Sequence, residues 1–276
     1  MIIHHIAPKN KSDWHPLWLK CYESWKKVFG NNYEFKLWND KEDIDRLVKT
    51  NYNKYYDIYR SFPAHIMKID FARLCILHSY GGIYSDMDVF CYKDFTDYFN
   101  DESENYLLEA PYGDIPIENA LMVSLNLNSK FFEFCIEESI NSYLILSKNL
   151  KITYPWDNKT NRELVLNTAG PALIYNSAVK YGIKNIWILN GKLFNNHGMS
   201  YDSSFYTKHI LTGVWGKEAI NHLKKQFKLN NENCKTFNDF INHIYIKDVK
   251  KYANMNNVTV ETFDFYTDYT NGNYLK

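Results

Sequence analysis

The sequence has few cysteines, and no two of them have the spacing of a metal-binding or redox pair. The five are an odd number and lie far apart, at Cys21, Cys75, Cys91, Cys135 and Cys234. A disulfide framework and a structural zinc site both need closely spaced cysteines, so neither class is indicated. Reduced, mostly buried thiols in a cytoplasmic protein are the expectation that remains.

The sequence also lacks long apolar runs and an excess of charge of either sign. No stretch approaches the roughly 18 apolar residues of a membrane span, and residues 1–6 lack the basic and apolar regions of a secretory signal. The 32 Lys and Arg residues balance 32 Asp and Glu residues. General nucleic-acid binders usually carry a basic excess. We therefore expect no nucleic-acid partner and no transmembrane segment, while peripheral contact with a membrane stays open.

Aromatic residues, in contrast, are abundant. They make up 17% of the 276 residues and include 23 tyrosines. One interpretation is a core built with Tyr and Phe, and the other is stacking surfaces for sugars or a base; for any single tyrosine the core is the more common role. The length is sufficient for one large α/β domain with a sizeable core.

The order of the elements along the chain predicts an α/β sheet. Residues 2–7 form a short apolar strand, 14–29 have helical spacing of apolar residues, and 33–38 alternate as in a half-buried strand. A short helix carrying Ile44 and Leu47 follows. Strand–helix–strand–helix order favours a sheet covered by helices. Later elements are expected as strands near 106–110 and 185–189, a strand and helix across 120–142, and helices after Gly170-Pro171, near 217–228 and near 236–250.

The clearest block of the sequence is a helix, a glycine pair and a strand that carries two acidic residues. Residues 64–80 have the helical pattern, and Gly81-Gly82 supply the left-handed turn that ends it. Residues 83–90 then predict a strand. Side chains two apart in a strand share a face, so Asp86 and Asp88 are expected to converge while Met87 points into the layer behind.

Two convergent carboxylates predict a divalent metal site. They repel each other unless a cation lies between them. Mg²⁺ and Mn²⁺ prefer oxygen ligands and can bridge to a diphosphate, and open α/β sheets bind ligands at the carboxyl ends of their strands. Asp-x-Asp alone is weak support, because it is also common in solvated loops. The contiguous block around it favours the metal interpretation.

The block from Lys68 to Val89 (KIDFARLCILHSYGGIYSDMDV) resembles the DXD sugar-binding region of glycosyltransferase family 32. That family includes yeast mannosyltransferases and bacterial capsular-polysaccharide enzymes, and the catalytic domains of clostridial glucosylating toxins carry a similar block. The resemblance covers residues 1–95. It implies a GT-A fold, with a Rossmann-like mixed sheet flanked by helices over residues 1–216. The helices expected near 217–228 and 236–250 would form a C-terminal extension packed on it, over 217–276.

The resemblance returns in two later segments. Asn167–Pro171 is similar to a Thr-Gly-Pro turn of the family, although Ala169 is inserted before the glycine. Tyr206–Trp215 is similar to the closing His…Gly-x-Trp element, although Val214 replaces the usual small residue. The resemblance implies that His209 is the third metal ligand, beside Asp88 with Asp86 assisting, and that Trp215 contacts the donor.

The resemblance also implies a set of donor-binding residues, in which Ile6 and Ala7 act through the backbone on the nucleobase. Asp70 and Arg73 would contact ribose and sugar hydroxyls; the alternative is a surface ion pair of little energetic weight. Tyr84 would lie near the donor sugar, or else only pack under the helix. Asn119 would hold a sugar hydroxyl, or only stabilise a turn. The full set is Ile6, Ala7, Asp70, Arg73, Tyr84, Asp86, Asn119 and Trp215.

The function that the resemblance implies is a retaining hexosyltransferase of polysaccharide biosynthesis that depends on Mn²⁺ or Mg²⁺, with Asp86 and Asp88 as its catalytic residues. The donor is a nucleotide sugar, with a UDP-hexose such as UDP-glucose, UDP-galactose or UDP-N-acetylglucosamine favoured over GDP-mannose. The acceptor is a hydroxyl of a glycan, glycolipid or protein. Two alternatives are a nucleotidyltransferase, which residues 7–13 disfavour because they contain no glycine, and a catalytically silent sugar-binding relative, which the intact acidic pair disfavours.

Overall fold

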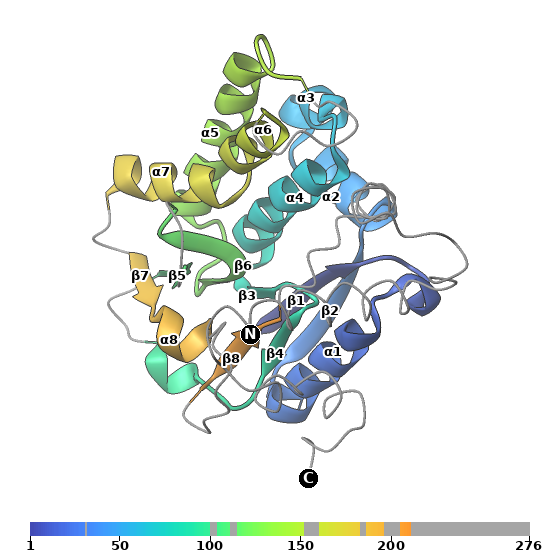
Figure 1. Cartoon of the computed structure of the whole chain (residues 1–276), viewed down its shortest axis with the longest axis vertical. Coiled ribbons are helices and arrows are strands. Elements are labelled where there is room, and N and C mark those ends of the chain that lie inside the picture. The colour runs from blue at the N-terminus through green and yellow to red at the C-terminus, as the bar shows by residue number, and fades with distance from the viewer. Residues whose placement is uncertain are drawn as a thin grey trace, which may run out of the picture. The chain divides into compact units, whose positions relative to one another are not determined.

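A six-stranded mixed sheet in the order β2-β1-β3-β6-β5-β7 lies at the centre of the computed structural model (Figure 1). Its strands are β1 (Ile2–Ala7), β2 (Glu34–Asn39), β3 (Gly82–Ser85), β5 (Asn105–Glu109), β6 (Ile117–Ser124) and β7 (Ile186–Leu189). Strand β1 is parallel to β2 and β3, β6 is antiparallel to β3 and β5, and β7 is parallel to β5. A second, two-stranded sheet pairs β4 (Val89–Cys91) with β8 (Thr207–His209) in antiparallel orientation.

The structure describes residues 1–30, 32–99, 104–110, 115–151, 160–182, 186–195 and 205–210, which lie in one compact unit. The helices are α1 (Pro16–Phe29), α2 (Glu42–Asn51), α3 (Tyr56–Ser61), α4 (His65–Tyr80), α5 (Lys130–Leu146), α6 (Thr160–Thr168), α7 (Pro171–Tyr181) and α8 (Gly191–Phe194). Short 3₁₀ turns occupy Lys11–Asp13, Asn53–Tyr55 and Thr96–Tyr98. No helix in these ranges is long and apolar enough to span a bilayer.

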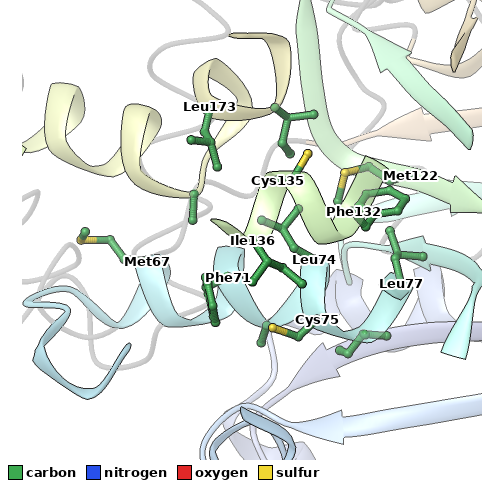
Figure 2. Packing of buried hydrophobic residues seen from close by; sticks show 14 of the residues in the cluster. Met67, Phe71, Leu74, Cys75, Leu77, Met122, Phe132, Cys135, Ile136 and Leu173 are labelled. Carbon is green, nitrogen blue, oxygen red and sulfur yellow. The ribbon is translucent and has the colours of Figure 1, made fainter. Parts of the chain in front are cut away.

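One face of the large sheet is covered by α2 and α4 to α7, and the core beneath them is apolar. Phe71 and Leu74 of α4 pack with Phe132 and Ile136 of α5 and with Met122 of β6 (Figure 2). Helix α4 is buried over most of its circumference, which is typical of a helix in the centre of a fold. A buried charged residue on such a helix needs a specific partner, and α4 carries two of them, Asp70 and Arg73.

The other face of the sheet is covered by α1, α8 and the β4–β8 sheet. Trp25 of α1 is fully buried and stacks on Phe29, with ring centroids 5.7 Å apart. Its indole Nε1 donates a hydrogen bond to the carbonyl of Val89 at 2.8 Å. The buried tryptophan therefore ties α1 to the first residue of β4 and fixes where the chain goes after the acidic pair.

Most of the predicted elements are confirmed, but the strand predicted over 83–90 is wrong as one continuous strand. Strand β3 ends at Ser85, and residues 86–88 form a turn in which the amide of Val89 donates to the carbonyl of Asp86 at 3.2 Å. The chain turns because β3 pairs with β6 whereas β4 pairs with β8. Asp86 and Asp88 therefore converge through a turn and not through the pleat of a strand.

Four further elements, α3, α6, α8 and β8, were not predicted because each is short or lacks a clear apolar period. Met87 is buried against Ala7 and Trp14, as predicted. The mixed α/β class, with a Rossmann-like sheet flanked by helices, is confirmed. The helices predicted near 217–228 and 236–250, and with them the extension over 217–276, lie outside the described residues.

The glycine pair after α4 allows β3 to approach β1 closely. Gly82 has a φ of 88°, and a Cβ on it would lie 2.2 Å from the carbonyl oxygen of Ile2. We expect Gly82→Ala to lower the free energy of unfolding by at least about 2 kcal/mol, from backbone strain and the contact together. Urea unfolding measures this. Gly182→Ala is the matched control, since Gly182 has a φ of 94° but, among the described residues, no neighbour within 4 Å of its Cβ position. An equal loss in both variants would contradict the close approach of the strands.

Candidate functional site

The turn that carries Asp86 and Asp88 meets a histidine from the far end of the described chain. Strand β8 pairs His209 with Val89, and the amide of Ile210 donates to the carbonyl of Asp88 at 2.9 Å. The Nε2 atom of His209 lies 3.2 Å from Oδ1 of Asp88. One ligand atom from each of Asp86, Asp88 and His209 lies within 4.8 Å of the others. Two carboxylates and an imidazole form a donor set that fits a divalent cation.

The charges at this turn are concentrated and largely shielded from water. Burial raises the pKa of the Asp86 carboxyl, and the neighbouring Asp88 raises it further against the opposing charge of Arg73. Burial acts to lower the pKa of His209, but the carboxylates of Asp88 and Glu118 outweigh it and raise that pKa to about 10. Negative charge therefore predominates around the imidazole, as expected of a place built to hold a cation.

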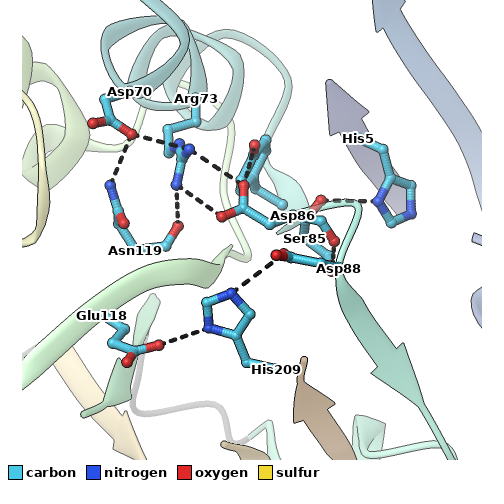
Figure 3. A network of polar contacts seen from close by, with 10 residues as sticks. His5, Asp70, Arg73, Ser85, Asp86, Asp88, Glu118, Asn119 and His209 are labelled. Atoms are coloured by element: carbon cyan, nitrogen blue, oxygen red, sulfur yellow. Dashed lines mark hydrogen bonds and ion pairs between the residues drawn. The ribbon is translucent and has the colours of Figure 1, made fainter. Parts of the chain in front are cut away.

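A second polar cluster surrounds the guanidinium of Arg73 (Figure 3). Its Nη2 atom lies 3.0 Å from Oδ1 of Asp70 and 3.2 Å from Oδ1 of Asp86, and its Nη1 donates to the carbonyl of Asn119 at 2.8 Å. The Asn119 amide donates to Asp70 at 3.1 Å, and the Tyr84 hydroxyl donates to Asp86 at 2.7 Å. Every member of this cluster contacts at least one other member.

Asp70 and Arg73 are buried within this cluster, so the surface ion pair considered for them is wrong. Their side chains are 5% and 3% exposed. Burial raises the pKa of Asp70 to about 7, partly offset by the charge of Arg73 and by the hydrogen bond from Asn119, while Asp86 raises it further. Tyr84 is buried under α4 and also has the Arg73 guanidinium 4.9 Å from its ring centroid. The packing interpretation of this tyrosine is therefore confirmed, and its place near the donor sugar stays a prediction.

Asp86 joins the two clusters, and an irregularity in β6 supplies a residue to each. On β5, Leu107 and Leu108 are adjacent, but they pair with Met122 and Glu118 of β6. The intervening residues of β6 bulge away from β5, and such bulges re-aim side chains. Glu118 then contacts Nδ1 of His209 at 3.0 Å, while Asn119 contacts Asp70.

The two adjacent histidines of β1 hold the backbone around β3. His4 Nε2 donates to the carbonyl of Gly81 at 2.9 Å, and its Nδ1 accepts from Trp38 at 3.2 Å, so this histidine is buried and satisfied, as was expected of one of the pair. His5 Nδ1 donates to the carbonyl of Ser85 at 2.8 Å. Burial lowers the pKa of both, to about 4 and about 3. Both rings are therefore neutral, and their hydrogen bonds stabilise the backbone at the two ends of β3, next to the acidic turn.

The structure thus brings together seven of the predicted site residues, while two of the described ones lie apart from them. The seven are Asp70, Arg73, Tyr84, Asp86, Asp88, Asn119 and His209. Ile6 is buried in the apolar core beneath α2 and α4 to α7, and Ala7 packs against Met87 behind the turn. Trp215 lies outside the described residues. Sequence reasoning missed Glu118 as a site residue; a signal for it was an acidic residue next to Asn119 in a mostly apolar strand.

Comparisons with known proteins agree with this picture over part of the chain. Residues 16–106 match the family described as the glycosyltransferase sugar-binding region containing the DXD motif. Inositol phosphoceramide mannosyltransferase 1 of Schizosaccharomyces pombe is 41% identical over 63 residues, which are 23% of this chain and 19% of that protein. An uncharacterized glycosyltransferase, L373 of Acanthamoeba polyphaga mimivirus, is 37% identical over 95 residues, covering 30% of this chain and 38% of that protein.

Among solved structures, the PaToxG glycosyltransferase is similar at a TM-score of 0.48 and 16% identity, over 65% of this chain and 69% of that one. The chain spans about a fifth of the yeast relative and well under half of the viral one. The family match contains α4, the glycine pair, Asp86 and Asp88. Through this region the chain is similar to the glycosyltransferases with a DXD-containing sugar-binding region, in agreement with its resemblance to family 32.

Proposed function

We propose that this protein transfers a hexose from a nucleoside-diphosphate sugar to a hydroxyl group of an acceptor, in a reaction that depends on a divalent metal. The observation that carries the proposal is the adjacency of two clusters that share Asp86. One is the candidate metal set of Asp86, Asp88 and His209, and the other is the buried cluster around Arg73. The first suits a diphosphate with its cation, and the second suits a polyhydroxylated ligand.

Asp88 and His209, with Asp86, are the proposed ligands of the metal. Carboxylate oxygens and a neutral imidazole nitrogen are both acceptable to Mn²⁺, which makes it the first cation to test, with Mg²⁺ second. Bound there, the cation would offset the negative charge that develops on the departing nucleoside diphosphate. Two contacts stabilise the turn that carries the two aspartates. Met87 is buried behind it, and the indole of Trp25 donates a hydrogen bond to the carbonyl of Val89.

The residues around Arg73 are proposed to bind the ribose and the sugar. Asp70, Arg73 and Asn119 already fix one another, so their remaining hydrogen-bonding atoms are preorganised for hydroxyl groups. Among the described residues, the buried Nε of Arg73 has no hydrogen-bond partner. Tyr84 is proposed to hold Asp86 in place under the sugar. Trp215 and the backbone of Ile6 and Ala7 stay in the proposal as further donor contacts.

The proposed reaction proceeds with retention of the anomeric configuration. The bond from the anomeric carbon to the diphosphate oxygen breaks, and the acceptor oxygen forms its bond on the same face. The acceptor proton passes to the leaving phosphate. NMR spectroscopy of the first-formed product should show the α-anomer from an α-linked donor, and a β-linked product would contradict same-face attack.

The donor is proposed to be a UDP-hexose or GDP-mannose, and different observations favour each. Resemblance to the bacterial and toxin enzymes favours a UDP-hexose. The name of the yeast relative specifies mannose transfer to inositol phosphoceramide, which favours GDP-mannose and a glycolipid acceptor. Glycans and proteins remain candidate acceptors beside glycolipids.

The test is release of nucleotide from a panel of UDP- and GDP-sugars in the presence of Mn²⁺, followed by the same assay with chelator. We expect slow hydrolysis of one donor, abolished by the chelator and restored by added Mn²⁺. This result would identify the class and the donor together. No hydrolysis of any donor, together with no metal-dependent thermal shift with UDP or GDP, would instead favour a silent sugar-binding protein.

A further inference from the structure

Glu118 lies behind the proposed metal site and contacts the far side of its histidine. The His209 ring has Nε2 directed at Asp88, 3.2 Å away, and Nδ1 directed at Oε2 of Glu118, 3.0 Å away (Figure 3). Glu118 comes from β6 of the large sheet and His209 from β8 of the small one. The contact therefore connects the two sheets at the site itself.

A histidine that binds a metal through one ring nitrogen must carry its proton on the other. A carboxylate can only accept a hydrogen bond, so Glu118 requires the proton on Nδ1 and leaves the Nε2 lone pair on the side of Asp86 and Asp88. Carboxylates in this position fix the orientation of the ring and raise its basicity as a ligand. The side chain of Glu118 is 22% exposed and that of His209 is 12% exposed, so water screens the contact only in part.

We infer that Glu118 is the positioning residue of the metal ligand His209, a role that rests on the proposed metal-dependent function. Glu118 is not itself one of the three clustered ligands, since its carboxylate contacts the nitrogen that faces away from Asp88. The bulge in β6 gives the role a structural basis. It directs Glu118 to the metal side and Asn119 to the sugar side from consecutive positions of one strand.

The test compares Mn²⁺ binding to wild type, Glu118→Gln, Glu118→Asp and Glu23→Gln, by electron paramagnetic resonance of free Mn²⁺. Glu23 is an exposed residue of α1 and serves as the matched control. We expect Glu118→Gln to weaken Mn²⁺ binding about 10-fold or more. Glu118→Asp, which keeps the charge but is shorter, should weaken it less, and Glu23→Gln should leave it unchanged.

Pulsed electron paramagnetic resonance of the bound Mn²⁺ adds a readout that a merely structural role of Glu118 would not change. In wild type we expect coupling to a directly bound imidazole nitrogen, which His209→Asn removes and Glu118→Gln reduces. Thermal unfolding followed by circular dichroism shows whether each variant is folded. If Glu118→Gln is not folded, Glu118→Asp replaces it in the test.

The outcomes separate this inference from the function on which it rests. If wild type binds neither Mn²⁺ nor Mg²⁺, the proposed metal site fails. If wild type binds Mn²⁺ with nitrogen coupling, and Glu118→Gln shows the same coupling and affinity within twofold, the metal site stands and the role of Glu118 is overturned.

Discussion

Asp88→Asn is expected to lower metal-dependent hydrolysis of the donor by about 10³-fold. Asparagine keeps the volume of the side chain but removes the charge that, in our proposal, binds the cation. Loss of several kcal/mol of charge stabilisation, at about 1.4 kcal/mol per tenfold in rate, corresponds to this effect. The fold should persist, because Glu118 still contacts His209 and the turn is closed by backbone groups.

The measurement is nucleotide release at saturating donor and Mn²⁺, beside the matched variant Asp57→Asn. Asp57 is an exposed aspartate of α3, so its replacement should leave the rate unchanged. Unfolding curves in urea should confirm that Asp88→Asn is folded. If folded Asp88→Asn retained a tenth or more of the wild-type rate, Asp88 could not be a principal metal ligand.

Arg73→Met is expected to have the largest effect on stability, and to abolish donor hydrolysis as well. Arg73 is the cation between the carboxylates of Asp70 and Asp86, at 3.0 Å and 3.2 Å. Removing it leaves two acidic groups near each other in a place that water reaches poorly. Breaking a buried ion pair from one side costs about 3–5 kcal/mol of unfolding free energy.

Urea unfolding measures the loss, and two further variants make the prediction specific. Arg46→Met removes an arginine whose side chain is 75% exposed, and should change stability by less than about 0.5 kcal/mol. The double variant Arg73→Met with Asp70→Asn should recover part of the lost stability, because it removes one of the two stranded charges, but no activity. Arg73→Met with wild-type stability would mean that the cluster is not an ion-pair network.

The parts of the site that could be predicted from the sequence are those with local signals. The apolar period of α4, the glycines that end it and the acidic pair beyond them all lie within one short block. The i, i+3 spacing of Asp70 and Arg73 also placed these two on one face of the helix. Such features are determined by neighbours in sequence, and the structure retains them.

The parts that could not be predicted depend on pairing between distant segments. The break at Ser85 arises because β4 leaves the large sheet to pair with β8, and nothing in residues 83–90 alone indicates this. Glu118 reaches His209 across 91 positions through a bulge that no local pattern marks. Likewise, Arg73 of helix α4 is buried with its guanidinium donating to the carbonyl of Asn119, which lies on the distant strand β6.

In the proposed function, Asp86, Asp88 and His209 bind the metal that accompanies a nucleotide-sugar donor. Anomalous diffraction at the manganese absorption edge, from crystals of the protein grown with Mn²⁺ and UDP or GDP, tests it most directly. We expect one strong manganese peak bonded to the Asp88 carboxylate and to Nε2 of His209, with diphosphate oxygens completing its coordination. A nucleotide bound with no manganese at these residues, or a manganese ion bound elsewhere, would contradict the proposed metal site.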